Sequence, residues 1–204
     1  MSSGLDRDEA LQLMTQNVQS PGLRRHMFAV EAAMRLYAEN LAAPPDLWGL
    51  AGLLHDYDWE IHPTLEDHPA KGVPLLREVG CPESVVQAIL SHNSAGSGVE
   101  RREPMDYALL ACDEITGLMI AAALIRPSKD IREMKLKSVK KRWREKAFAA
   151  GVDRLEVEDA TRDFSDECFG GRLELWDHAA NVLAAMQDTA QVLELDGRLA
   201  TPQS

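Results

Sequence analysis

The sequence contains little cysteine, few aromatic residues and an excess of acidic over basic charge. Only three of its 204 residues are cysteines, Cys81, Cys112 and Cys168, and none of them forms a CxxC pair. An odd, scattered set of this kind does not indicate a disulfide framework, so we expect reduced thiols in a cytoplasmic protein. Aromatic residues make up 5% of the chain against an apolar fraction of 45%. This balance is typical of a helical protein rich in alanine and leucine.

Further absences narrow the class of protein. We find no apolar run long enough to cross a bilayer, and the start Met1–Asp6 has neither the basic residues nor the apolar stretch of a secretory signal. The turn Ser94–Gly98 contains glycine but lacks the Gly-Lys-Ser/Thr ending of a phosphate-binding loop. The net charge of −11 argues against a general nucleic-acid binder. We therefore expect neither a membrane nor nucleic acid as a partner, and we leave a homo-oligomer open.

Basic residues are concentrated in one segment. Residues 126–146 hold ten Lys or Arg against three Asp or Glu, a local charge of +7, so the remainder of the chain carries −18. One interpretation is a solvated helix face that balances an acidic body. The other places Lys137, Lys140 or Lys141 at the mouth of a pocket, where they would attract a phosphorylated substrate that the acidic surface repels.

Helical periodicity dominates the chain, and we find neither an internal repeat nor a convincing strand. The sequence therefore predicts an all-α fold. We expect an N-terminal helix in 1–22, a core in 23–125 and a C-terminal helical extension in 126–204 packed on the same domain, with a frayed tail over 196–204. The expected helices cover residues 5–20, 23–40, 47–57, 68–79, 82–92, 105–125, 135–150, 153–164 and 171–195.

A histidine and an aspartate stand side by side at the end of an apolar helix. His55 shares the apolar face of 47–57, and Asp56 follows, turned by about 100°. His26 likewise shares an apolar face with Val30 and Tyr37. A core histidine with a hydrogen-bond partner is the plainer interpretation of His26. A buried carboxylate such as Asp56, however, is costly unless it is paired or bound to a cation.

Three further histidine and aspartate residues, later in the chain, are candidates for a functional role. His92 ends the apolar face of 82–92, and Asp113 lies amid alanine and other apolar residues, where an unpaired carboxylate is expensive. His68, before Pro69, is interpreted either as a helix cap or as a ligand. His62 is expected in an exposed loop over 57–67, with a substrate contact as the alternative, and His178 is expected on the surface.

Imidazoles and carboxylates without thiolates favour a catalytic metal over a structural zinc site. Helical bundles build such centres from inward side chains on facing helices. His26, His55, Asp56 and Asp113 suffice for one divalent ion; His68 and His92 would complete a second, with Asp56 as the bridge. His55 and Asp56 are the catalytic candidates. The sequence does not distinguish Mn, Fe, Mg, Co, Ni and Zn, nor one ion from two.

The order His, His-Asp, His, His, Asp resembles the HD superfamily of metal-dependent phosphohydrolases, whose signature matches Leu53-Leu54-His55-Asp56. The resemblance covers about 23–125, is closest to the HDIG type and implies an HD-domain helical bundle. The run from His68 to Gly72 is similar to the H-x-x-x-G element that supplies further ligands in two-metal members. The region Ser91–Gly96 lacks the Gly-Tyr-Pro element of cyclic-di-GMP phosphodiesterases. Residues 137–152 resemble an uncharacterised subgroup.

Three hypotheses for function follow. The first is a metal-dependent hydrolase of a small phosphate ester, with a nucleotide as the expected substrate. The second is a di-iron HD oxygenase that uses the same ligands to activate O₂. The third is a non-catalytic, nucleotide-sensing HD module. The complete ligand set counts against the third hypothesis, because a pure binding domain has no need of groups that activate water.

Overall fold

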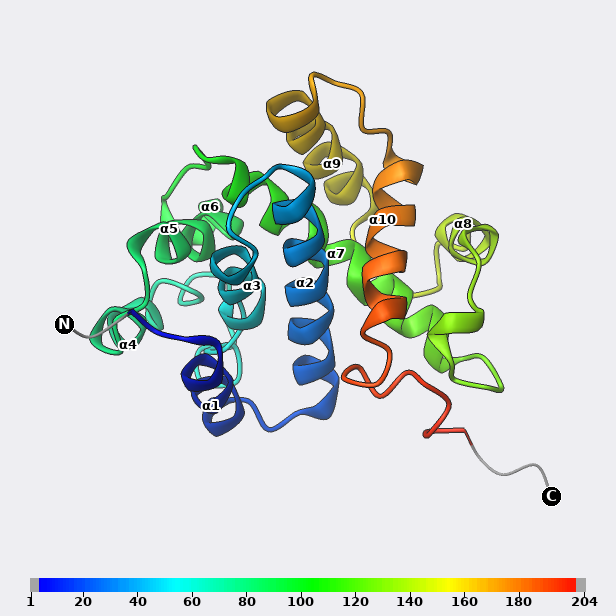
Figure 1. Ribbon diagram of the computed structural model, residues 1–204, viewed down its shortest axis with the longest axis horizontal. Helices are drawn as coiled ribbons and strands as arrows, with labels where there is room; N and C mark the ends of the chain where they lie inside the picture. Colours follow the sequence, from blue (N-terminus) through cyan, green and yellow to red (C-terminus); the bar gives the residue numbers. More distant parts are fainter. Residues whose placement is uncertain (1–3, 201–204) are drawn as a thin grey trace. The chain divides into compact units, whose positions relative to one another are not determined.

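A computed structural model describes residues 4–200 as helices joined by turns (Figure 1). No β-strand forms within this range, where an isolated bridge joins Asp130 to Asp196. The all-α prediction is therefore confirmed. Residues 1–3 and 201–204 lie outside the described residues, and so do the parts of the expected N-terminal helix and frayed tail that fall on them. The chain divides into two compact units, Met1–Leu110 and Ala111–Ser204.

The first unit contains six helices among its described residues, and a seventh helix begins in it and ends in the second unit. They are α1 (Arg7–Asn17), α2 (Pro21–Asn40), α3 (Pro45–Leu54), α4 (Val73–Glu78), α5 (Glu83–His92), α6 (Ser94–Ser97) and α7 (Pro104–Leu124). The second unit continues with the 3₁₀ turn η1 (Ile131–Glu133), α8 (Leu136–Arg144), α9 (Arg154–Phe169) and α10 (Leu175–Asp188).

Helix α2 packs along α3, which also contacts α1 and α5 (Figure 1). It starts where the Ser20 hydroxyl accepts a hydrogen bond from the Leu23 N–H and Pro21 takes the first helical position. Its buried Glu31 accepts two hydrogen bonds from Arg7 of α1 (2.6 and 2.9 Å) and one from Arg35 (3.0 Å). These charged contacts fasten α1 to α2.

Gly52 allows α3 to approach α2 closely. A Cβ atom at this position would lie 2.7 Å from the backbone N and Cα of Glu31 and 2.8 Å from the carbonyl carbon of Val30. Such contacts with backbone cannot be relieved by a change of rotamer, so only glycine fits here. The apolar helix that ends in the His-Asp pair is therefore held against the helix that carries His26.

In the second unit, α10 packs against α8, α9 and η1. The Gln187 side chain donates to the carbonyl oxygens of Ile131 (3.0 Å) and Met134 (2.8 Å). The prediction that His178 lies on the surface is wrong. Its ring is fully buried, and Nε2 donates to the Ala111 carbonyl oxygen at 2.7 Å. Burial lowers the pKa of His178 to about 4, because the charged form is poorly solvated there.

Helix α7 contradicts the expectation that no apolar run is long enough to cross a bilayer. With 21 residues and a mean hydropathy of 1.6 in its most apolar window, it is long and apolar enough to cross a membrane. Most of that window, 61%, is buried. Near its start, the buried Asp106 accepts from the backbone N–H groups of Arg102 (3.0 Å) and Glu103 (3.2 Å). Burial along most of the helix, with an internal carboxylate that accepts backbone hydrogen bonds through Oδ2, is typical of a core helix in a globular domain.

Several local predictions differ from the observed structure. His68 lies in turns before α4 instead of opening a helix. Asp130 caps the short η1 through the Arg132 N–H. The expected turn over 94–98 contains the short helix α6, and α8 ends at Arg144, six residues early.

Candidate metal centre

Two histidines meet between α2 and the end of α3. His26 projects from α2, and His55 is the residue that ends α3. Their Nε2 atoms lie 3.2 Å apart. His55 is fully buried, and its Nδ1 lies 2.9 Å from the Gly52 carbonyl oxygen. Because a carbonyl can only accept, Nδ1 carries the proton, and Nε2 presents a lone pair when the ring is neutral.

A second pair of histidines forms within the same unit. The Nε2 atoms of His68, in the turns before α4, and His92, at the end of α5, lie 3.0 Å apart. His92 Nδ1 donates to the Ile89 carbonyl oxygen at 2.5 Å, and His68 Nδ1 donates to Asp58 Oδ1 at 2.7 Å. Neutral rings would present two facing lone pairs here, an arrangement that a proton on one Nε2 atom or a cation beside both would stabilise.

Asp56 lies between the two pairs. Its Oδ1 is 3.2 Å from His68 Nε2 and 3.7 Å from His92 Nε2. Its Oδ2 is 3.5 Å from His55 Nε2 and 3.8 Å from His26 Nε2. One carboxylate thus directs each oxygen at a different pair of imidazoles.

The electrostatics of the protein alone agree with this geometry. Burial raises the pKa of Asp56, but the charge of His55 and hydrogen bonds from His55, His68 and His92 outweigh it and hold that pKa well below its usual range. Burial lowers the pKa of His68, whereas hydrogen bonds to Asp56 and Asp58 raise it, for a net value of about 9. With a pKa above neutral, the His68 ring is positively charged at pH 7 and faces the anionic Asp56.

The donor set fits a divalent metal. In one group, donor atoms of Asp56, His68 and His92 all lie within 4.8 Å of one another. Imidazole nitrogens and carboxylate oxygens are ligands that Mn, Fe, Co, Ni and Zn ions accept. Asp113 is half-buried on the part of α7 that belongs to the second unit. The ligand role of each of these residues stays a prediction.

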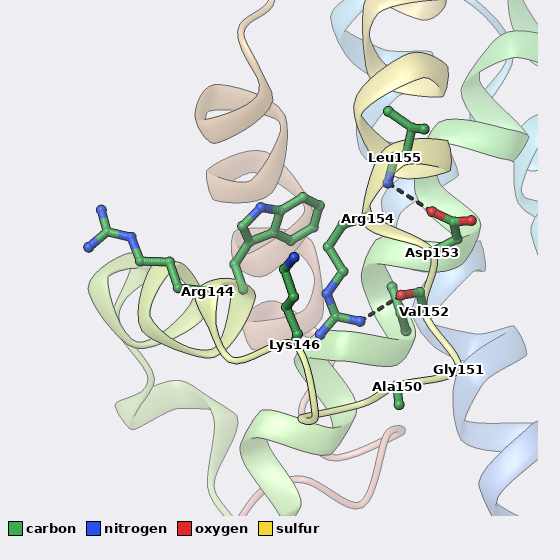
Figure 2. Close-up of a pocket in the computed structure, with 9 residues that line it drawn as sticks. Arg144, Lys146, Ala150, Gly151, Val152, Asp153, Arg154 and Leu155 are labelled. Carbon is green, nitrogen blue, oxygen red and sulfur yellow. Dashed lines mark hydrogen bonds between the residues drawn. The ribbon is translucent and has the colours of Figure 1, made fainter.

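The predicted substrate lysines lie on α8 in the second unit. Lys137, Lys140 and Lys141 line a hollow of about 470 Å³, and Lys140 Nζ lies 5.0 Å from the centre of the Trp176 ring. A larger hollow of about 640 Å³ lies beside it, where Arg154 bonds to the Val152 carbonyl oxygen at 2.6 Å (Figure 2). Substrate binding by the three lysines stays a prediction.

Asp58 is a residue that sequence reasoning missed. The sequence predicts a polar loop over 57–67 and shows no periodicity there that would indicate a buried position. In the structure, Asp58 is 1% exposed and bonded to His68. Its spacing, two residues after Asp56, is the signal that could have drawn attention to it. His62, in the same segment, is half-buried, and its role stays open.

The fold and the site define an all-α domain with a histidine- and aspartate-rich centre of the kind that holds divalent metals. The HD domain family matches residues 23–124, which is half of the chain. The chain therefore belongs to the HD domain family, a superfamily of metal-dependent phosphohydrolases. No curated protein and no solved structure matches it.

Proposed function

We propose that this chain is a metal-dependent phosphohydrolase that cleaves a small phosphate ester, such as a nucleotide or a related monoester or diester. The position of Asp56 between two pairs of imidazoles, all presenting Nε2, is the observation that carries the proposal. Membership in a family made up mostly of metal-dependent hydrolases supports the same reaction class.

The proposal gives each candidate a task. Within the first unit, His26 and His55 would be ligands to one ion, His68 and His92 ligands to a second, and Asp56 a ligand to both; the ligand role of Asp113 stays a prediction. When bound, divalent ions polarise a phosphoryl oxygen and lower the pKa of water toward neutrality. The carbonyl oxygens of Gly52 and Ile89 hold the Nδ1 protons of His55 and His92, so both rings keep Nε2 directed into the centre.

The basic face of α8 is proposed to attract the phosphorylated substrate. Lys137, Lys140 and Lys141 add positive charge to a chain with a net charge of −11, and a phosphorylated substrate is anionic. Replacing all three lysines with alanine should raise KM for the substrate. If KM is unchanged for every phosphate ester that the protein cleaves, this role is wrong.

Metal analysis of the purified protein, followed by turnover assays, tests the proposal. The metal-free chain is loaded with Mn²⁺, Mg²⁺, Co²⁺, Fe²⁺, Ni²⁺ or Zn²⁺ and offered a panel of phosphomonoesters and diesters. Release of phosphate that a chelator abolishes is the expected result. Bound iron with oxygen consumption and no phosphate release would instead favour the di-iron oxygenase. Stabilisation by nucleotides without turnover would favour the sensing module.

The proposal also covers the cellular compartment, the subgroup of the family and the oligomeric state. Cys81, Cys112 and Cys168 are free thiols, which supports a reducing compartment, the cytoplasm. We also propose that the chain belongs with HDIG-type members, on the sequence from His55 to Asp56 and from His68 to Gly72. A homo-oligomer remains open, and light scattering on the purified chain measures it.

A further inference from the structure

Asp58 and His68 form a buried pair next to the centre. Asp58 Oδ1 accepts a hydrogen bond from His68 Nδ1 at 2.7 Å, and the two side chains are 1% and 2% exposed. The opposite nitrogen of the same ring, Nε2, faces Asp56 Oδ1 and His92 Nε2. A carboxylate is costly to bury this deeply, so its partner must recover much of that cost.

The partner of Nδ1 differs among the histidines of the centre. In His55 and His92, Nδ1 donates to a carbonyl oxygen three residues earlier in its own helix. In His68 it donates to a carboxylate ten residues away. A negative partner increases the electron density on the ring and makes Nε2 a stronger donor to a cation than a neutral carbonyl does.

Gly72 supplies the space for this carboxylate. A Cβ atom at Gly72 would lie 2.6 Å from Cγ and Oδ2 of Asp58. The backbone angles of Gly72, φ −73° and ψ −34°, suit any residue, so glycine is required here for room and not for conformation. The Tyr57 hydroxyl donates to the Gly72 carbonyl oxygen at 2.5 Å and fixes this segment.

We propose that Asp58 is a positioning residue that orients His68 and strengthens its Nε2 as a ligand, so that the half of the centre formed by His68 and His92 binds a divalent cation more tightly. Gly72 is required because it leaves room for the Asp58 carboxylate. The inference rests on the proposed function, in which His68 is a metal ligand. It extends that proposal to residues outside the ligand set.

Co²⁺ titrated into the metal-free full chain tests the inference by calorimetry. Asp58→Asn keeps the size and an acceptor oxygen but removes the charge, and we expect one Co²⁺-binding step to weaken by about 10- to 100-fold. Asp67→Asn is the matched control: Asp67 precedes His68 directly but pairs with the exposed Lys71 (2.9 Å). We expect the control to keep every step within about twofold of the wild type.

Two further variants separate positioning from a general loss of structure. Gly72→Ala should weaken the same Co²⁺ step, because its methyl group displaces the Asp58 carboxylate. In an Asp58→Gly background the added methyl group meets no carboxylate, so Gly72→Ala should weaken binding by less than about twofold further. Equal losses in both backgrounds would overturn the role given to Gly72.

A spectroscopic readout follows the hydrogen bond without any metal. The Nδ1 proton of His68 stays on the ring whether or not Nε2 is protonated, and a carboxylate acceptor shifts its NMR signal downfield. This signal should move upfield in Asp58→Asn and disappear in Asp58→Leu. If Asp58→Asn folds, yet neither this signal nor any Co²⁺ step changes, the inference is wrong. A wild-type chain that binds no Co²⁺, Mn²⁺ or Zn²⁺ would instead overturn the proposed function, and the inference with it.

Discussion

His68 and His92 direct their Nε2 atoms at one another across 3.0 Å, and in each ring Nδ1 already donates to another acceptor. Neutral rings in this arrangement would place two lone pairs face to face, which is unfavourable unless a proton or a metal ion lies beside them. His55 Nδ1 is likewise bound to the Gly52 carbonyl oxygen, so its Nε2 also presents a lone pair when the ring is neutral. A proton on Nε2 of His68, or a metal ion beside both Nε2 atoms, would therefore stabilise this arrangement.

Asp56→Asn should remove metal binding and phosphate release with little change in the fold. The amide keeps the volume of the carboxylate but lacks the charge that both pairs of imidazoles face, so bound metal should fall to less than about a tenth of the wild-type level. Phosphate release should fall at least about 100-fold. Mass spectrometry of bound metals and the turnover assay measure the two effects.

Asp46→Asn is the matched control for this change. Its side chain is 93% exposed and pairs with Arg35, away from the histidines. We expect metal content and turnover to match the wild type. Normal metal content in Asp56→Asn would show that Asp56 is not a shared ligand.

Gly52→Ala should destabilise the protein and weaken metal binding together. The new methyl group would meet the backbone of Glu31 at 2.7 Å, so α3 must move away from α2. Overpacking of this kind costs about 1–3 kcal/mol of unfolding free energy. The shift would also separate His55 from His26. Urea unfolding and Co²⁺ titration measure the two consequences.

Gly22→Ala provides the comparison, because its methyl group would meet only the Ser20 hydroxyl oxygen at 3.5 Å. Alanine is favoured over glycine in a helix by up to about 1 kcal/mol. We therefore expect Gly22→Ala to leave stability unchanged or raise it. A Gly52→Ala variant as stable as Gly22→Ala would contradict the close packing of α2 and α3.

The sequence predicts the helices well because apolar residues recur along them with helical spacing, as at Val30 and Tyr37 of α2. It also selects His55 and His92, which end apolar helix faces. The sequence does not predict the burial of a residue whose neighbours come from distant parts of the chain. His178 was expected on the surface because it lies off the apolar stripe of its helix, yet its partner is a carbonyl 67 residues earlier. Asp58 lies among turns, whose sequence has no helical spacing of apolar residues that would indicate a buried position.

Glu31→Gln tests the charged contacts that hold α1 against α2. Glu31 has a side chain only 6% exposed and accepts two hydrogen bonds from Arg7 and one from Arg35. Breaking a buried charge pair costs about 3–5 kcal/mol. Because both arginines are partly exposed to solvent, we expect about 2 kcal/mol.

Glu83→Gln is the control for Glu31→Gln. Glu83 also bonds to an arginine, Arg77, through two contacts (3.1 and 2.5 Å), but both side chains are largely exposed. We expect its unfolding free energy to equal that of the wild type within error. Similar losses for the two variants would mean that burial does not determine the strength of these pairs.

His178 should make the protein less stable in mild acid. Its pKa of about 4 in the folded chain lies below the ordinary 6.5, so the unfolded chain takes up this proton first as the pH falls. The contribution is complete above about pH 6.5 and is lost as the pH falls to about 4, for a total of about 3 kcal/mol. His178→Gln keeps a side-chain N–H for the Ala111 carbonyl oxygen but does not titrate.

Urea unfolding at pH 7, 5.5 and 4.5 should therefore show a steeper loss of unfolding free energy for the wild type than for His178→Gln. The other acidic and histidine groups titrate equally in both proteins. Parallel losses would show that His178 takes up its proton in the folded chain as readily as in the unfolded one.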